Sequence, residues 1–112
     1  MIVGVGLDLV DIARIRRLLD ERGERALAKL FTAGEAAYAA QRPEPARHLA
    51  ARFAAKEAAY KALAGTAAAR GIGWQDVEVV VEWDGRPTLR LHGRAAARAA
   101  ELGVTRAHLS LT

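Results

Sequence analysis

Hydrophobic positions recur with two different periods along this chain. In residues 3–9 and 77–91 they alternate with polar residues or glycines, which is the period of a β-strand. In residues 12–22 they recur every three or four positions, which is the period of a helix. The 112 residues therefore predict one small domain that combines strands and helices around a shallow core.

Capping signals set the limits of four predicted helices. Asp11 is a good N-cap, and Thr32 with Glu35 has the spacing of a capping box, so we give Glu35 a structural role. Pro45 suits the first turn of a helix, and glycines at positions 65 and 103 are typical C-terminal caps. The predicted helices span residues 12–22, 33–42, 45–65 and 94–102.

The predicted N-terminal strand has one nearly bare face. Its odd-numbered residues from Val3 to Leu9 are apolar, whereas the other face carries only Gly4, Gly6 and Asp8. Glycines inside a strand are typical of places where another backbone or a ligand comes close. A helix that packs tightly here and a ligand that binds here both fit this pattern.

Residues 77–91 predict a β-hairpin, and two loop lengths are possible for it. A two-residue turn at positions 84–85 would set Val79 opposite Arg90. A three-residue loop over positions 83–85, with Gly85 in a left-handed bulge, keeps the valines beside the leucines, and we predict this loop. A final strand over residues 106–112 is expected to turn its alanine and leucines inward. Its polar face, which is either a ligand wall or the solvent side of an edge strand, holds Arg106, His108, Ser110 and Thr112.

A few charged residues interrupt the otherwise apolar, alanine-rich helix around residues 51–65. Glu57 and Lys61 are four residues apart, and such a pair is commonly a solvated contact on a helix surface. Asp8 changes this interpretation, because two carboxylates that converge can hold a metal ion.

Composition excludes several kinds of chemistry. The chain has no cysteine, which excludes disulfides and thiolate sites, and its three histidines are scattered.

Seventeen Lys and Arg against 13 Asp and Glu give a net charge of +4, and most of the cations are arginine, which favours an anionic partner. The hydrophobic fraction of 52% is high for this length, so we expect other subunits to cover apolar surface. The apolar N-terminus is too short to span a membrane and lacks a basic leader, so we expect a soluble, cytoplasmic protein.

The first predicted helix has a basic side. Arg14, Arg16 and Arg17 lie between its apolar positions without an acid among them. Exposed basic helices are usually only solvated, but this one also suits an acidic protein partner.

Several ordered motifs resemble those of holo-acyl-carrier-protein synthases, which are small bacterial phosphopantetheinyl transferases. The turn Asp84-Gly-Arg-Pro87 and the strand His108-Leu-Ser-Leu-Thr112 lie where that family has its counterparts. The three longer motifs are Gly4-Val-Gly-Leu-Asp8-Leu-Val-Asp-Ile-Ala-Arg14, Phe31-Thr-Ala-Gly-Glu35-Ala-Ala-Tyr38 and Arg52-Phe-Ala-Ala-Lys56-Glu57-Ala-Ala-Tyr-Lys61-Ala. The resemblance covers nearly the whole chain and implies an α+β fold in which an antiparallel sheet packs on a long central helix, as a single domain over residues 1–112.

The resemblance also implies an activity and its catalytic residues. Members of the family move 4′-phosphopantetheine from coenzyme A to a serine of an apo acyl carrier protein and release adenosine 3′,5′-bisphosphate. By this likeness Asp8 and Glu57 hold Mg²⁺ at the coenzyme's pyrophosphate, and Lys61 neutralises phosphate charge. Two acids without a histidine cluster suit that ion. Either Glu57 or a water on the metal takes the proton of the serine, and the residues leave this open.

Further roles follow from the same likeness. Arg52 and Arg47, with His48 beside it, are expected to face the 3′-phosphate of the coenzyme, and Pro87 is expected to lie near its adenine. His108 is expected to reach a phosphate held by the next subunit, because the family forms trimers with active sites between chains. The residues expected to bind the acidic carrier protein are Arg14 and Arg17, with Arg22 or Arg25.

Two observations weigh against this assignment. In the family the last strand continues into a histidine and another short strand, whereas this sequence stops at Thr112. We therefore expect a shortened chain or an abbreviated final hairpin, with an incomplete interface. The positive charge also fits a small nucleic-acid-binding module, but the predicted strands offer only Trp83 for base stacking, and that alternative leaves Asp8 and Glu57 unexplained. A purely structural oligomer without chemistry is a third alternative, and we disfavour it as well.

Overall fold

The computed structural model describes residues 1–63 and 71–111, and these form an α+β fold. Within the described ranges it has four α-helices, one 3₁₀ helix and a two-stranded antiparallel sheet. In chain order the elements are α1 (Ile12–Leu30), α2 (Ala33–Ala40), α3 (Pro45–Leu63), η2 (Trp74–Asp76), β1 (Val77–Val81), β2 (Pro87–Leu91) and α4 (Gly93–Glu101). The predicted cap at position 65 lies outside the described residues.

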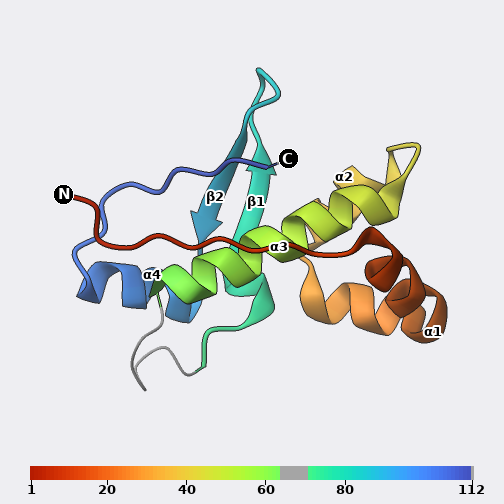
Figure 1. Ribbon diagram of the computed structural model, residues 1–112, viewed down its shortest axis with the longest axis horizontal. Coiled ribbons are helices and arrows are strands. Elements are labelled where there is room, and N and C mark those ends of the chain that lie inside the picture. The colour runs from red at the N-terminus through yellow and green to blue at the C-terminus, as the bar shows by residue number, and fades with distance from the viewer. Residues whose placement is uncertain (64–70, 112) are drawn as a thin grey trace.

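Helix α3 is the centre of the molecule, and two hydrophobic clusters lie along it. Helices α1 and α2 pack at one end of α3, and β1 and α4 pack toward the other end (Figure 1). The buried residues of the first cluster are Ile15, Leu30, Phe31, Ala39, Leu49, Ala50 and Phe53. Those of the second are Leu63, Val77, Ala95 and Ala99. The predicted long central helix with a sheet packed on it is therefore confirmed.

The observed helix limits follow the capping signals, except that the sequence did not predict the second half of α1. The side chain of Asp11 accepts a hydrogen bond from the backbone N–H of Ala13 at 2.9 Å, and the capping box of Thr32 and Glu35 is present. The predicted end near Arg22 corresponds to a break at Gly23, where φ is +55° and ψ is −135°. The helix then resumes and continues to residue 30, and this second half was not predicted.

The hairpin has the predicted three-residue loop. Val79 pairs with Leu89, and Val77 pairs with Leu91, so the apolar residues of both strands share one face. The last backbone pair before the loop joins the N–H of Glu82 to the carbonyl of Arg86 at 2.9 Å, and Gly85 has a φ of +85°.

The two terminal strands were predicted wrongly. Residues 1–10 and 104–111 have no regular secondary structure, and no strand ladder joins them to another segment of the described residues, so neither is a strand. The predicted alternation of side chains between two faces was correct for the N-terminal segment. Its glycine face turns toward α3, while Leu7 and Leu9 on the other face are exposed. The C-terminal segment has Leu109 and Leu111 half-buried, whereas Ala107 is exposed. Side-chain period alone does not show whether a neighbouring backbone is present to complete a ladder.

Candidate functional site

The N-terminal segment lies along α3 (Figure 1). Near its end, Asp8 meets the helix at Lys61. A Cβ atom added at Gly6 would lie 1.7 Å from the carbonyl oxygen of Ala58, and one at Gly4 would lie 2.7 Å from that of Ala62. Only glycine fits against the helix backbone at these distances. The bare face therefore serves close packing of the segment, and this packing fixes where Asp8 meets α3.

Asp8 meets Lys61 at the end of this segment. Lys61 Nζ lies 2.9 Å from Asp8 Oδ1, and it also donates to the carbonyl of Leu7 at 3.2 Å. The Asp8 side chain is 12% exposed and the Lys61 side chain is 55% exposed. The lysine head group is thus accessible, whereas the carboxylate is largely enclosed.

Glu57 lies close enough to Asp8 for their charges to interact. Partial burial raises the pKa of Glu57, and the negative charge of Asp8 raises it further, whereas Arg14 and Lys61 lower it. Two carboxylates on different segments therefore share one small region, as the sequence predicted for a metal site.

The residues present fit a hard divalent cation. Asp8 Oδ2 is buried, and no hydrogen-bond partner reaches it from the described residues. A buried carboxylate oxygen without a donor is costly, and a cation would satisfy it. Residues 1–63 and 71–111 contain no group of three or more acids, histidines or cysteines placed to bind a metal. Magnesium suits such a two-carboxylate site, because it usually keeps several waters and takes substrate phosphates as further ligands.

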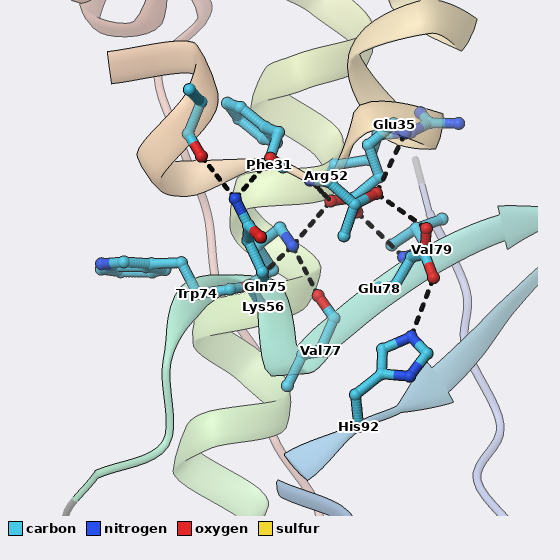
Figure 2. Close-up of polar contacts among 12 residues, drawn as sticks. Phe31, Glu35, Arg52, Lys56, Trp74, Gln75, Val77, Glu78, Val79 and His92 are labelled. Atoms are coloured by element: carbon cyan, nitrogen blue, oxygen red, sulfur yellow. Dashed lines mark hydrogen bonds and ion pairs between the residues drawn. The ribbon is translucent and has the colours of Figure 1, made fainter. Parts of the chain in front are cut away.

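The neighbouring residue Lys56 was not predicted to have a role, and it is fully buried. Its side chain is 1% exposed, and its Nζ lies 2.7 Å from Glu35 Oε1, whose side chain is 0% exposed (Figure 2). The sequence signal for this pair was the capping box, which placed Glu35 at the start of α2 but did not reveal its partner.

Arg47 and Arg52, which were predicted to face the 3′-phosphate, lie in the N-terminal half of α3. Arg52 is only 3% exposed; it donates from Nη1 to the carbonyl of His48 at 3.2 Å and stacks on the ring of Tyr38. Burial lowers the pKa of His48, and the positive charges of Arg52, Arg42 and Arg47 lower it further. This end of α3 is therefore strongly electropositive.

A groove of about 1010 Å³ separates the two terminal segments. Asp8 and His108 both line it, and its floor is formed by alanines of α3. Pro87 is the first residue of β2, where it pairs with Val81. Several exposed apolar side chains flank the groove, namely Ile2, Val5, Leu7 and Leu9.

The predicted carrier-binding arginines lie on the exposed side of α1. Arg14 and Arg17 line a cavity of about 290 Å³ together with Phe53. Arg22 and Arg25 are exposed on either side of the break at Gly23. None of the helices in the described ranges is long and apolar enough to cross a membrane.

The sequence matches one protein family over nearly its whole length. Residues 4–112 match the 4′-phosphopantetheinyl transferase superfamily. The holo-(acyl-carrier-protein) synthase of Alkalilimnicola ehrlichii is 52% identical over 113 positions, covering 100% of this chain and 88% of the relative. The protein of the same name from Anaeromyxobacter is 51% identical over 115 positions, covering 100% of this chain and 87% of the relative.

Solved structures agree with the sequence matches. The holo-(acyl-carrier-protein) synthase of Neisseria meningitidis superposes with a TM-score of 0.80 at 31% identity, covering 95% of this chain and 84% of the other. The synthase of Bacillus anthracis in complex with CoA (3′,5′-ADP) superposes with a TM-score of 0.70 at 33% identity, covering 83% and 78%. All these matches are carrier-protein synthases, so the nucleic-acid-binding alternative receives no support from them.

Proposed function

The chain belongs to the 4′-phosphopantetheinyl transferase superfamily, and on that premise we propose that it transfers 4′-phosphopantetheine from coenzyme A to a serine of an apo acyl carrier protein. Residues 1–112 act as a single transferase domain in this proposal. The observation that carries it is the meeting of Asp8 and Glu57, with one buried carboxylate oxygen unsatisfied and Lys61 beside it.

Each of these three side chains has its own role. Asp8 and Glu57 would hold a Mg²⁺ ion, which would supply charge stabilisation to the phosphoryl group and to the leaving oxygen. The Lys61 side chain is 55% exposed, and its ammonium group would turn from Asp8 toward a phosphate oxygen of the coenzyme. Its four-carbon chain allows that movement without a change in the helix.

The reaction exchanges one phosphorus–oxygen bond for another. The serine oxygen forms a bond to the phosphorus that bears pantetheine, and the bond from that phosphorus to the bridging oxygen breaks. The leaving group is adenosine 3′,5′-bisphosphate. Either Glu57 or a water molecule takes the serine proton.

The distribution of positive charge along α3 favours a site shared between two copies of the chain. Arg47 is fourteen residues before Lys61, or about 20 Å along the helix axis. The 3′-phosphate and the pyrophosphate of coenzyme A are attached to the same ribose, so these two residues of one rigid helix are poorly spaced to contact both. Arg47 and His108 of a neighbouring copy would complete the site, while Pro87 lies near the adenine. A trimer would also cover the apolar groove.

The role of Arg52 in this proposal is less direct. Its guanidinium is enclosed beside Tyr38, although its Nε has no partner among the described residues. Contact with the 3′-phosphate therefore requires that Arg52 leave part of its present packing. On α1, Arg14, Arg17, Arg22 and Arg25 provide the basic surface for the acidic carrier protein.

Mass spectrometry tests the proposal directly. The protein is incubated with coenzyme A, Mg²⁺ and an apo acyl carrier protein, and the carrier is then weighed. A phosphopantetheine group on its serine is expected, and its formation should stop when a chelator removes the metal. An unmodified carrier, with retardation of RNA by the protein in a gel, would instead favour the nucleic-acid-binding alternative.

A further inference from the structure

The buried pair of Glu35 and Lys56 contacts more elements than an ordinary ion pair. Lys56 Nζ donates to Glu35 Oε1, to the carbonyl of Trp74 at 2.7 Å and to the carbonyl of Val77 (Figure 2). Glu35 accepts the backbone N–H of Val79 at 2.9 Å on Oε2 and that of Thr32 at 3.0 Å on Oε1. The pair therefore ties α3 to α2, to η2 and to β1.

These contacts fix both the position of the Lys56 side chain and the direction in which it points. An ammonium group has three donors, and all three of Lys56 have an acceptor. The acceptors come from different elements, so Lys56 cannot turn without leaving at least one of them unsatisfied. A buried ion pair is weak support for stability, because two hydrophobic residues often stabilise a fold as well. It is better explained by what it orients.

Lys56 precedes the proposed metal ligand Glu57 on the same helix. Successive residues turn by about 100°, so Lys56 and Ala58 point to nearly opposite sides of α3. Gly6 packs on the backbone of Ala58, and Glu35 holds Lys56. Helix α3 is thus held from both sides, and Glu57 lies between these two contacts.

A small rotation of α3 would displace the Glu57 carboxylate. A group about 6 Å from a helix axis moves about 1 Å for each 10° of rotation. Displacements near 1 Å in a catalytic arrangement lower rates by on the order of 100-fold.

We propose that Glu35 and Lys56 are positioning residues of the transfer reaction, which fix the rotation of α3 and so hold Glu57 against Asp8. This inference rests on the function proposed above. It assigns to the buried pair an effect on cation binding and turnover, in addition to any effect on folding.

The test compares four proteins at a temperature at which circular dichroism shows all of them folded. The double variant Glu35→Gln/Lys56→Met removes both charges and leaves no buried charge unpaired. Glu35→Asp keeps both charges but shortens the link by one methylene, which makes it the variant most certain to fold. Leu30→Ala removes packing from the first hydrophobic cluster without touching the pair, and so controls for destabilisation. Wild type completes the set.

Two measurements are made on each protein. Titration with Mn²⁺, followed by electron paramagnetic resonance without coenzyme A, gives the affinity of the cation site. Steady-state transfer gives kcat and the KM for the carrier protein. We expect the double variant to bind Mn²⁺ at least tenfold more weakly and to lose on the order of 100-fold in kcat. Its KM for the carrier should stay within about twofold, because α1 is unchanged. Glu35→Asp should fall between it and wild type.

The outcomes separate this inference from the proposed function. If wild type is active while the double variant and Glu35→Asp both keep wild-type affinity and kcat, the positioning role is refuted and the transferase stands. If Leu30→Ala shows the same losses as the double variant, the pair acts only through stability, and the inference is again refuted. A wild-type protein that neither binds Mn²⁺ nor transfers phosphopantetheine refutes both proposals.

Discussion

On one side of α3, Lys56 has an acceptor for each of its three protons and Glu35 accepts two backbone N–H groups, all away from solvent. On the other side, Asp8 keeps one buried oxygen without a partner, and Lys61 is largely exposed. Each side has an ion pair between a lysine of α3 and an acid from another segment. They differ in whether the polar groups are satisfied within the chain.

This difference distinguishes polar groups of α3 that are satisfied within the chain from polar groups that need a ligand. A buried polar group that remains unsatisfied costs free energy, so natural structures contain few of them. The satisfied pair therefore needs no partner from outside the chain and acts by holding α3 in place, whereas the unsatisfied Asp8 oxygen needs an external partner. The proposed cation and substrate phosphates are such partners. Variants on the two sides of α3 should accordingly have different effects.

The largest effect is expected at the proposed metal ligands. Asp8→Asn and Glu57→Ala should each lower transfer by about 1000-fold, because the charge that stabilises the transition state loses its support. The fold should be retained. Ion pairs with an exposed partner, such as Asp8 with Lys61, contribute only about 0–1 kcal/mol. Transfer assays and thermal melts on the same samples measure the two effects.

A remote ion pair provides the control. Glu101→Gln removes the negative charge that pairs with Arg94 and Arg98 on α4, away from the site, and should leave transfer unchanged. Near-normal turnover in either carboxylate variant would contradict the metal assignment.

Gly6→Ala should have the next largest effect, because it disturbs the same site from the N-terminal segment. The added Cβ would lie 1.7 Å from the Ala58 carbonyl oxygen, so the segment must lift away from α3 and take Asp8 with it. We expect a loss of on the order of 100-fold in kcat, together with weaker Mn²⁺ binding. Gly4→Ala, with its milder approach of 2.7 Å, should lose less.

Val5→Ala is the matched control in that segment. Its side chain is exposed, and its loss leaves the glycine packing on α3 intact, so Mn²⁺ binding should stay as in wild type. Equal Mn²⁺ affinity of Gly6→Ala and Val5→Ala would show that Asp8 does not depend on this packing.

Features that depend on residues close together in the sequence were predictable from it. Asp11 caps α1, Thr32 and Glu35 form a capping box, and the three-residue loop followed from keeping Val79 beside Leu89. Each of these depends on a few neighbouring positions.

Features that depend on distant residues were not predictable in the same way. The ion pair of Lys56 with Glu35 joins residues 21 positions apart, and neither residue signals the other in the sequence. The terminal strands failed because their alternation shows which side faces inward but supplies no backbone partner. Asp8 was found because a lone carboxylate among glycines is unusual, whereas the extension of α1 beyond Gly23 had no comparable signal.

A smaller effect is expected on the exposed face of α1. Arg14→Glu should raise the KM for the carrier protein by about tenfold and change the KM for coenzyme A much less, because charges at the rim of an interface chiefly affect encounter. Added salt should reduce the difference between the variant and wild type. Arg90→Glu, on the exposed edge of β2, is the charge-matched control. Equal changes in both KM values for Arg14→Glu would exclude α1 as the docking surface.

The smallest effect concerns Glu78, which lies on the satisfied side and should affect stability alone. Burial raises its pKa, but hydrogen bonds from His92 and Thr32 lower it more, so its net pKa lies below the ordinary 4.5. Because the folded-state pKa is the lower one, ionised Glu78 stabilises the fold above pH 4.5, and this contribution is lost as the pH falls through the folded-state pKa.

Glu78→Gln should therefore be less stable than wild type by about 1–2 kcal/mol at neutral pH, with a difference that shrinks toward acid pH. Urea unfolding of both proteins at a series of pH values measures this. Transfer at neutral pH should stay within about twofold of wild type, since Glu78 contacts neither Asp8 nor Glu57. A difference in stability that grows on acidification would contradict the lowered pKa. A large loss of transfer in the folded variant would instead show that Glu78 also helps to position the site.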